Sequence, residues 1–262
     1  MRQGPILIAG SVLSLLALLI VVATSIGNGN QSAPVPAPVI TPRPVVASPK
    51  EQAPVSLEPQ FLDPKHGGTV AYAQGDYGTA LDRYRKTIDT NPKDADALNN
   101  LGQVLTRTGK LTEAIQYFEQ AIRLYPKVWT YRFNLAHAYG QLADWAHAIT
   151  EYRAAQALFP DDYVTEFNLA MVLHKQGRED EAVTGYQKAI SLAPGEASFH
   201  LSLGLSYEKL NRPNDAVESY RRYLELAPEA PDAQKVKQRI QELTGPVAAD
   251  RGTSPPAPPK QG

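Results

Sequence analysis

Cysteine is absent from this chain of 262 residues. Disulfide bonds are therefore excluded, and so is a bacterial lipoprotein anchor, which needs a cysteine. Neither sign of charge dominates, because 26 Lys and Arg stand against 27 Asp and Glu, for a net charge of −1. A chain with no basic excess and no basic stripe gives no reason to expect nucleic acid as a partner.

Motifs that mark an enzyme are also missing. The sequence has no glycine-rich phosphate loop, no strand-to-helix turn around a nucleophilic serine, and no paired carboxylates in an apolar setting. His137 and His174 are expected on one face of neighbouring helices, but no third ligand accompanies them. We therefore expect no catalytic residue, no cofactor, no metal and no small-molecule substrate.

Proline, in contrast, recurs at a fixed spacing of 34 residues. Alanine, an aromatic residue and a leucine recur in the same register, and a small residue follows each leucine. Such self-similarity at one period indicates a repeat array. The four series are Pro92, Pro126, Pro160, Pro194 and Pro228; Ala80, Ala114, Ala148, Ala182 and Ala216; Tyr84, Phe118, Tyr152, Tyr186 and Tyr220; and Leu101, Leu135, Leu169 and Leu203.

One unit, residues 95–126, contains two helical patterns. Apolar and small residues at helical spacing predict one helix before Gly109 and a second helix after it. Gly109 suits the left-handed turn that ends a helix. Pro126 ends the second helix, because the residue before a proline is pushed out of the α region. Each unit is thus predicted to be a helix–turn–helix hairpin.

The order of these residues resembles the tetratricopeptide repeat, in which Leu-Gly, then Ala and an aromatic residue, then Pro follow one another. The resemblance covers residues 61–230 and implies an all-α fold, a right-handed α-solenoid of five units. After it, the apolar stripe of Val236, Ile240 and Leu243 predicts a capping helix over 231–244. The family serves as a scaffold for many partners, so the resemblance does not name the ligand.

Two units depart from the pattern. The first unit has Pro64, Gly67 and Gly68 within its first helix, which predicts a short helix because both residue types disfavour helix interiors. The fifth unit has Asn211 in place of the turn glycine and Pro213 two residues later. Proline fits the first turn of a helix, so no break is expected there.

Residues 1–27 are predicted to form a single N-terminal transmembrane helix. Residues 6–23 carry no charge, and at about 1.5 Å per residue the apolar run matches a hydrocarbon core of about 30 Å. A cleaved signal peptide is the alternative. Because Arg2 precedes the segment and Arg43 is the first cation after it, the N-terminus is expected in the cytoplasm. Either alternative puts the repeats outside the cytoplasm, which for a bacterial chain means the periplasm or an equivalent space.

Two stretches flank the repeats. Residues 28–60 form a predicted proline-rich linker, with eight prolines between 33 and 60, and residues 245–262 a proline-rich tail expected to be disordered. A linker role is favoured over binding of a proline-recognising domain.

The resemblance also implies that the first helix of each unit lines an inner groove. Asn100, Asn134 and Asn168 recur in one column there, and an asparagine amide both donates to a carbonyl and accepts from an N–H group. Flanking columns complete the predicted partner-binding groove. They contain Asn99, Phe133, Phe167 and Leu201, and Gln103, His137, Met171 and Leu205. Phe133, Phe167, Met171, Leu201 and Leu205 are expected to form an exposed apolar patch of the kind that marks an interaction site.

These features predict a non-catalytic, membrane-anchored adaptor. Its groove would bind an extended or helical segment of a partner protein and support assembly, secretion or maturation of an envelope complex. The alternative is a structural scaffold in which identical chains assemble through the apolar patch, without a separate peptide ligand.

Overall fold

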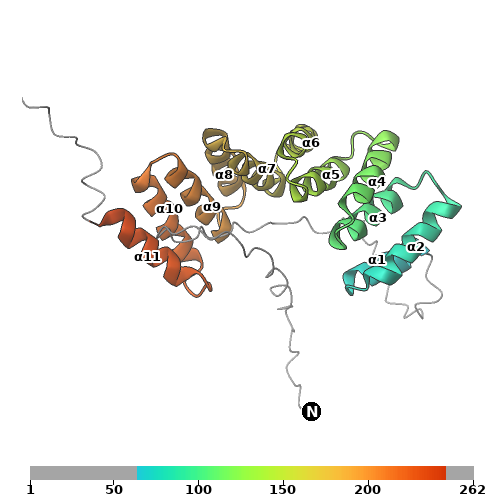
Figure 1. Cartoon of the computed structure of the whole chain (residues 1–262), viewed down its shortest axis with the longest axis horizontal. Helices are drawn as coiled ribbons and strands as arrows, with labels where there is room; N and C mark the ends of the chain where they lie inside the picture. The colour runs from blue at the N-terminus through green and yellow to red at the C-terminus, as the bar shows by residue number, and fades with distance from the viewer. Residues whose placement is uncertain (1–63, 246–262) are drawn as a thin grey trace, which may run out of the picture. The chain divides into compact units, whose positions relative to one another are not determined.

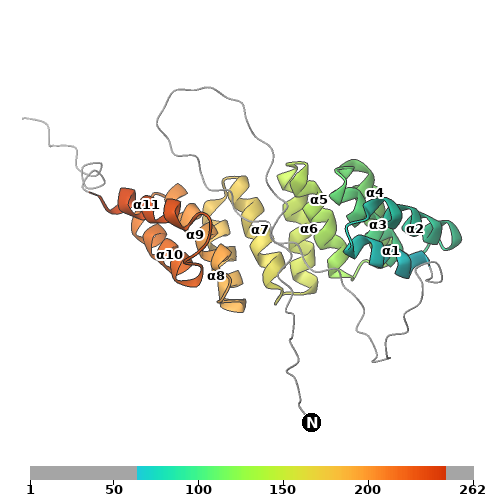
Figure 2. The same cartoon turned by 90° about the horizontal axis from the view of Figure 1, so that it is seen from below.

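The computed structural model describes residues 64–245, and within this range the chain forms eleven α-helices and no strand. Five hairpins are followed by a single helix, and the helices follow one another in chain order (Figures 1 and 2). The hairpins are α1 (Pro64–Ala73) with α2 (Tyr77–Thr90), α3 (Ala95–Arg107) with α4 (Leu111–Leu124), α5 (Trp129–Gln141) with α6 (Trp145–Leu158), α7 (Tyr163–Lys175) with α8 (Glu179–Leu192), and α9 (Ala197–Lys209) with α10 (Pro213–Leu226), and the last helix is α11 (Ala233–Thr244).

Each hairpin turns through a residue with positive φ, as the glycine at position 109 predicts. Gly109 has a φ of +78°, and its N–H donates to Thr106 O while the N–H of Lys110 donates to Leu105 O. This pair of bonds satisfies the last carbonyls of α3 and is the Schellman ending of a helix. The same pair recurs in all five hairpins. The fifth unit keeps it with Asn211, at φ +55°, and α10 begins at Pro213 without a break, as predicted.

The second helix of each unit ends at the residue before proline. Tyr125 has φ −136° and ψ 81°, which lies outside the α region, and Asn91 has φ −139° and ψ 86°. A proline ring disfavours helical geometry in its predecessor, so every unit ends at the same point of the sequence. The prolines therefore fix the inter-unit turns that separate one hairpin from the next.

The core lies where the two helices of a hairpin meet. The repeated alanines and aromatic residues are all buried. A Cβ atom added to Gly102 would lie 2.6 Å from Cε1 of Phe118, and one added to Gly204 would lie 2.4 Å from Cε1 of Tyr220. Glycine is thus needed at these positions because the ring of the second helix lies directly on the backbone of the first.

The first unit also places a small residue of its first helix against an aromatic ring of its second helix. Within the described residues, which begin at Pro64, helix α1 has 10 residues where α3, α5, α7 and α9 have 13, and Gly67 and Gly68 lie inside it. Gly68, however, is more than a helix breaker, because a Cβ there would lie 2.8 Å from Cε1 of Tyr84. It is the first member of the column of small residues that continues at Gly102.

Helix α11 packs on α10 and closes the array. Val236 is buried, Ile240 and Leu243 are half-buried, and the outer face carries exposed Lys and Gln side chains. Arg239 of α11 donates through Nε to Oε2 of Glu208 at 2.9 Å, which ties the cap to α9 as well. A terminal helix with a polar outer face is what a repeat array requires for solubility.

None of the helices between residues 64 and 245 combines the length and the apolar character needed to span a membrane. The predicted transmembrane helix over 1–27, the linker over 28–60 and the tail after Gly245 lie outside the described residues.

Candidate partner-binding groove

The predicted site residues lie on the first helices of four successive units. These helices contact one another directly, α3 with α5, α5 with α7, and α7 with α9, so their inner faces form one continuous surface. Three residues come from each of α3, α5 and α7 and two from α9. They are Asn99, Asn100 and Gln103; Phe133, Asn134 and His137; Phe167, Asn168 and Met171; and Leu201 and Leu205.

Amide side chains form a connected ladder across α3 and α5. Asn134 Nδ2 donates to Asn99 Oδ1 at 2.8 Å, and Asn99 Nδ2 donates to Asn100 Oδ1 at 3.4 Å. Gln103 Nε2 also donates to Asn100 Oδ1, at 3.3 Å. We call these four residues the amide ladder. Asn100, Gln103 and Asn134 are only half-buried, so each keeps part of its hydrogen-bonding surface open to a ligand.

The column is not uniform along the array. Asn168 is buried, and its Nδ2 donates to Val164 O of its own helix at 2.8 Å. Ser202, the next position in the column, is buried as well and donates to Ser198 O at 3.0 Å. A side chain whose donor is bound to its own helix backbone presents less to a ligand. The open part of the asparagine column is therefore limited to the second and third units.

The predicted apolar patch is wrong. Phe133 and Phe167 are fully buried, Leu201 is 3% exposed and Met171 is 8% exposed, so only the half-buried Leu205 reaches the surface. Phe133 meets the ring of Tyr152 edge-on at 5.3 Å, and Phe167 stacks on Phe199 at 4.7 Å. Sequence reasoning placed this column on the groove, whereas the contacts between successive first helices bury it within the array.

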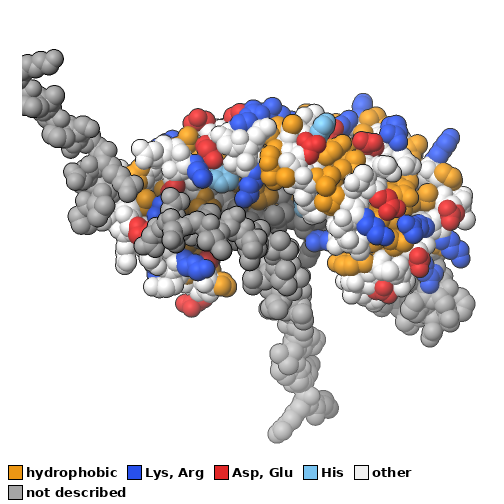
Figure 3. Space-filling view, in the orientation of Figure 1, with side chains coloured by type: hydrophobic (Ala, Val, Ile, Leu, Met, Phe, Trp, Pro, Cys, Tyr) orange, Lys and Arg blue, Asp and Glu red, His pale blue; other side chains and the backbone are white. Residues whose placement is uncertain are grey.

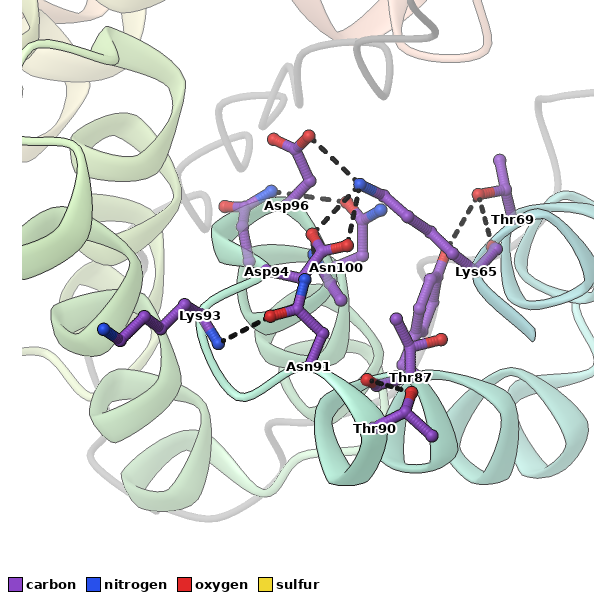
Figure 4. Close-up of polar contacts among 12 residues, drawn as sticks. Lys65, Thr69, Thr87, Thr90, Asn91, Lys93, Asp94, Asp96 and Asn100 are labelled. Carbon is purple, nitrogen blue, oxygen red and sulfur yellow. Dashed lines mark hydrogen bonds and ion pairs between the residues drawn. The ribbon is translucent and has the colours of Figure 1, made fainter. Parts of the chain in front are cut away.

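A polar cluster at the start of α3 was missed by the sequence analysis. Lys65 of α1 lies within 3.0 Å of Asp94 and 3.2 Å of Asp96, and Figure 4 shows its side chain reaching both carboxylates. Tyr131 of α5 donates to Asp96 Oδ1 at 2.5 Å. The sequence contains one indication of this cluster. Asp96 precedes Asn100 by four residues, so the two side chains lie on the same face of one helix.

These contacts change the pKa values of Lys65, Asp96 and Tyr131. Burial works against the charge of Lys65, but its hydrogen bonds to Asp94 and Asp96 outweigh burial and raise its pKa. Burial likewise opposes ionisation of Asp96, yet the bonds from Tyr131 and Lys65 lower its pKa. Burial, with the hydrogen bond to Asp96, raises the pKa of Tyr131. Lys65 and Asp96 therefore stay charged over the physiological range, whereas Tyr131 stays neutral.

The two histidines expected on the inner face differ in their surroundings. Burial, to which the charge of Arg107 adds, lowers the pKa of His137 to about 4, so this side chain is neutral at physiological pH. His174 lies between helices, with Nδ1 at 2.8 Å from Glu179 Oε2 and 3.0 Å from Ser206 Oγ. Across residues 64–245, His, Asp and Glu side chains are not grouped as a metal site would require.

Comparison with known families and proteins agrees with the repeat architecture. Models described as tetratricopeptide repeat match residues 67–128, 130–162 and 162–229. The peroxisomal targeting signal receptor of Kluyveromyces lactis is 36% identical over 69 residues, which are 26% of this chain and 12% of the receptor. The photosystem I assembly protein Ycf3 of Synechococcus elongatus is 38% identical over 74 residues, 26% of this chain and 40% of that protein. This chain thus matches less than half the length of either relative.

Solved structures share the fold over a longer stretch. The structure of MamA aligns with a TM-score of 0.57 and 25% identity over 64% of this chain and 90% of that one. YrrB, described as a TPR protein with an unusual peptide-binding site, aligns with a TM-score of 0.59 and 21% identity over 67% of this chain and 90% of that one.

Proposed function

Because the chain carries tetratricopeptide repeats between residues 67 and 229, we propose that it is a non-catalytic adaptor that binds an extended segment of a partner protein along its first helices. The observation that carries the proposal is the amide ladder, in which Asn134 of α5 is bonded to Asn99 of α3 at 2.8 Å. The ladder crosses from one unit to the next and so follows the path of a peptide laid across the helices.

The amide ladder suits a peptide backbone. Asn100 offers N–H donors, because its Oδ1 already accepts from Asn99 and Gln103, while the amides of Asn134 and Gln103 offer a carbonyl acceptor as well. Together these groups match the alternating C=O and N–H groups of an extended chain. The bonds within the ladder hold the side chains in place before a ligand arrives, which reduces the entropy lost on binding. Because backbone groups are common to all peptides, the ladder would supply affinity, and side-chain contacts elsewhere would supply selectivity.

Proteins with similar repeats support an interaction role. The similar proteins include a receptor for a targeting signal, a protein that assembles a photosystem, and a repeat protein with a peptide-binding site. Each of these roles involves recognition of another polypeptide or assembly of a complex. A scaffold of identical chains is less favoured, because four of the five residues of its expected interface are buried inside the array.

The proposal includes a place in the cell. The uncharged run over 6–23 supports an anchor, and the charge bias around it supports repeats on the outer side of the membrane, where they would serve assembly, secretion or maturation of an envelope complex. Extraction of cell membranes with alkaline carbonate tests the anchor, and protease added to spheroplasts tests the side. Release by carbonate, or protection from protease, would contradict these assignments.

The binding role is tested with paired variants of the full chain. Asn100→Ala with Asn134→Ala removes two open amides, and Gln116→Ala removes an exposed amide from the outer helix α4 as a matched control. At about 1 kcal/mol for each lost hydrogen bond, we expect about tenfold or more weaker recovery of crosslinked partners with the double variant. Recovery equal to that of the Gln116→Ala control would remove the groove from the mechanism.

A further inference from the structure

Exposed aromatic side chains lie at two successive inter-unit turns, away from the amide ladder. Tyr125 is 57% exposed and Phe159 is 44% exposed, and each directly precedes a turn proline. The ring of Trp129 stacks on Phe159, with centroids 5.3 Å apart and planes 30° apart. Hydrophobic side chains also gather over α5 and α6 on the face drawn in Figure 3. We call Tyr125, Trp129 and Phe159 the aromatic edge.

A surface pocket adjoins the aromatic edge. It has a volume of about 360 Å³ and opens between the turn before α3 and the turn before α5. Its walls combine aromatic and apolar side chains with carboxylates and one lysine. The lining residues are Asn91, Lys93, Asp94, Ala95, Asp96, Tyr125, Val128 and Tyr131. The side chain of Asp96 is 65% exposed there, although it already accepts bonds from Tyr131 and Lys65.

This combination suits a proline-rich segment that carries a basic residue. Polyproline II helices bind to exposed aromatic rings, because prolines present a rigid apolar surface at little entropic cost. Such a helix advances about 9.3 Å per three residues, and packed helices lie about 8–10 Å apart. Since α3 contacts α5 and α5 contacts α7, prolines spaced three apart would meet successive turns in register.

The chain itself contains one such segment. Residues 254–260 read Ser-Pro-Pro-Ala-Pro-Pro-Lys, so Pro255 and Pro258, and Pro256 and Pro259, are each three residues apart. No two of the eight prolines between 33 and 60 have that spacing. Residues 246–262 lie outside the described structure.

We propose that residues 254–260 bind in cis to the aromatic edge, with their prolines on Phe159 and Tyr125 and Lys260 at the carboxylate of Asp96. Lys260 follows Gly245 by 15 positions, a reach of about 46 Å at about 3.1 Å per residue. That reach covers the roughly 40 Å from the last unit back to α3, at about 10 Å per unit.

Direction and charge agree with this placement. A chain leaving the end of the array meets the turn at Phe159 before the turn at Tyr125, and the basic residue of the segment comes last, where Asp96 lies. Arg251 and Lys260 are the cations of the tail, and Asp161 and Asp162 follow Phe159 at the nearer turn. The basic end of the tail would therefore lie one helical turn from Asn100, at the border of the proposed groove.

Fluorescence of Trp129 tests the proposal. The chain has two tryptophans, so Trp145→Phe leaves Trp129 as the single reporter. In the full chain in detergent, replacing Pro255, Pro256, Pro258 and Pro259 with Ser should raise the acrylamide quenching constant of Trp129 about twofold, because its ring would lose a covering partner. A Lys260→Glu chain should shift in the same direction. An unchanged constant in either chain would overturn the assignment of the residues replaced in it.

Two controls separate the alternatives. In the reciprocal chain, Trp129→Phe leaves Trp145 as reporter, and its quenching should not respond to the tail, whereas a response would indicate a general effect on folding and overturn the proposal. Cis binding should persist on dilution over about two orders of magnitude, since it is intramolecular. A signal lost on dilution would overturn the cis assignment in favour of a second copy's tail. The Asn100→Ala with Asn134→Ala chain should keep the Trp129 signal. Loss of partner binding in the groove can therefore be told apart from loss of tail binding at the aromatic edge.

Discussion

Ala143 occupies the turn of the third hairpin in a backbone conformation that suits glycine. Its φ is +58°, whereas Gly75, Gly109 and Gly177 occupy the same position of their units with φ close to +78°. The left-handed region costs an L-residue about 1–2 kcal/mol through contact of Cβ with the following carbonyl. Asn211 tolerates this conformation at the fifth turn, but alanine has no polar side chain that favours it.

Ala143→Gly should therefore stabilise the protein. Relief of the left-handed strain exceeds the extra chain entropy of glycine, so we expect a gain of about 0.5–1 kcal/mol in the free energy of unfolding. Gly109→Ala is the matched reverse change, because a Cβ there meets nothing within 4 Å and the cost comes from the backbone alone. It should lose about 1 kcal/mol. Urea titrations measure both, and a loss with Ala143→Gly would contradict the argument.

His137 gives the fold a dependence on pH. Its pKa is lowered to about 4 in the folded protein, chiefly by burial, from an ordinary value of 6.5. Above pH 6.5 neither the folded nor the unfolded chain protonates this ring, so its contribution is constant. Between pH 6.5 and about 4 the unfolded chain binds the proton first, and stability falls as the pH falls.

The His137→Gln variant isolates this effect. Between pH 7 and pH 4 the parent should lose about 3 kcal/mol more unfolding free energy than the variant, because the variant has no ring to protonate. Denaturant titrations of both chains across this range measure the difference. Parallel pH profiles for the two chains would show that the ring is accessible to protons in the folded state.

At the scale of the helix and the hairpin, the sequence predicts most of what the structure contains. The turn at Gly109, the helix end before Pro126 and the capping helix follow from local rules about backbone conformation and apolar spacing. The column of Phe133 and Phe167 could not be assigned in the same way. Whether a column faces solvent or the next unit depends on how successive first helices pack, which is a long-range property absent from the pattern of one unit.

The cap helix is held by a side-chain network as well as by its apolar stripe. Glu208 of α9 accepts from Tyr220 of α10 at 2.5 Å and from Arg239 of α11 at 2.9 Å, so a single carboxylate joins the last three helices. The hydrogen bond to Glu208 is the leading cause of the raised pKa of Arg239. The carboxylate is mostly shielded from water, with a side-chain exposure of 16%, and such pairs contribute more than exposed ones.

Arg239→Met should loosen this end of the array. We expect a loss of about 1–2 kcal/mol, seen as faster amide hydrogen exchange in α11, because the carboxylate of Glu208 loses a charged donor while the methionine keeps the apolar contact. Arg222→Met is the matched control, since Arg222 pairs with Glu225 of its own helix and is about half exposed. It should cost less than about 0.5 kcal/mol. Equal effects of the two substitutions would count against the network.

For the molecule as a whole, contacts between helices stay local along the chain. Each helix of the described array packs on its neighbours in sequence, and the longer-range backbone contacts join first helices of successive units. Ion pairs such as Arg85–Glu113 and Arg153–Glu181 likewise reach only to the second helix of the next unit. Stability in such an array is approximately a sum of unit terms and nearest-neighbour interfaces. The same geometry explains why the fold is evident from sequence and the ligand is not: the repeated residues specify the stacking, whereas the open amides occupy only two of the five units.

This locality predicts that a defect in one unit remains near that unit. In Gly102→Ala the added Cβ would meet Phe118 at 2.6 Å, so α3 and α4 must separate, at a cost of about 1–3 kcal/mol. Hydrogen exchange should speed up in α1 to α5 and stay unchanged in α9 to α11. Gly204→Ala makes the same clash with Tyr220 in the fifth unit and should give the opposite distribution. If either substitution accelerated exchange evenly from α1 to α11, the repeats would unfold as one cooperative block, which would contradict the local description of stability.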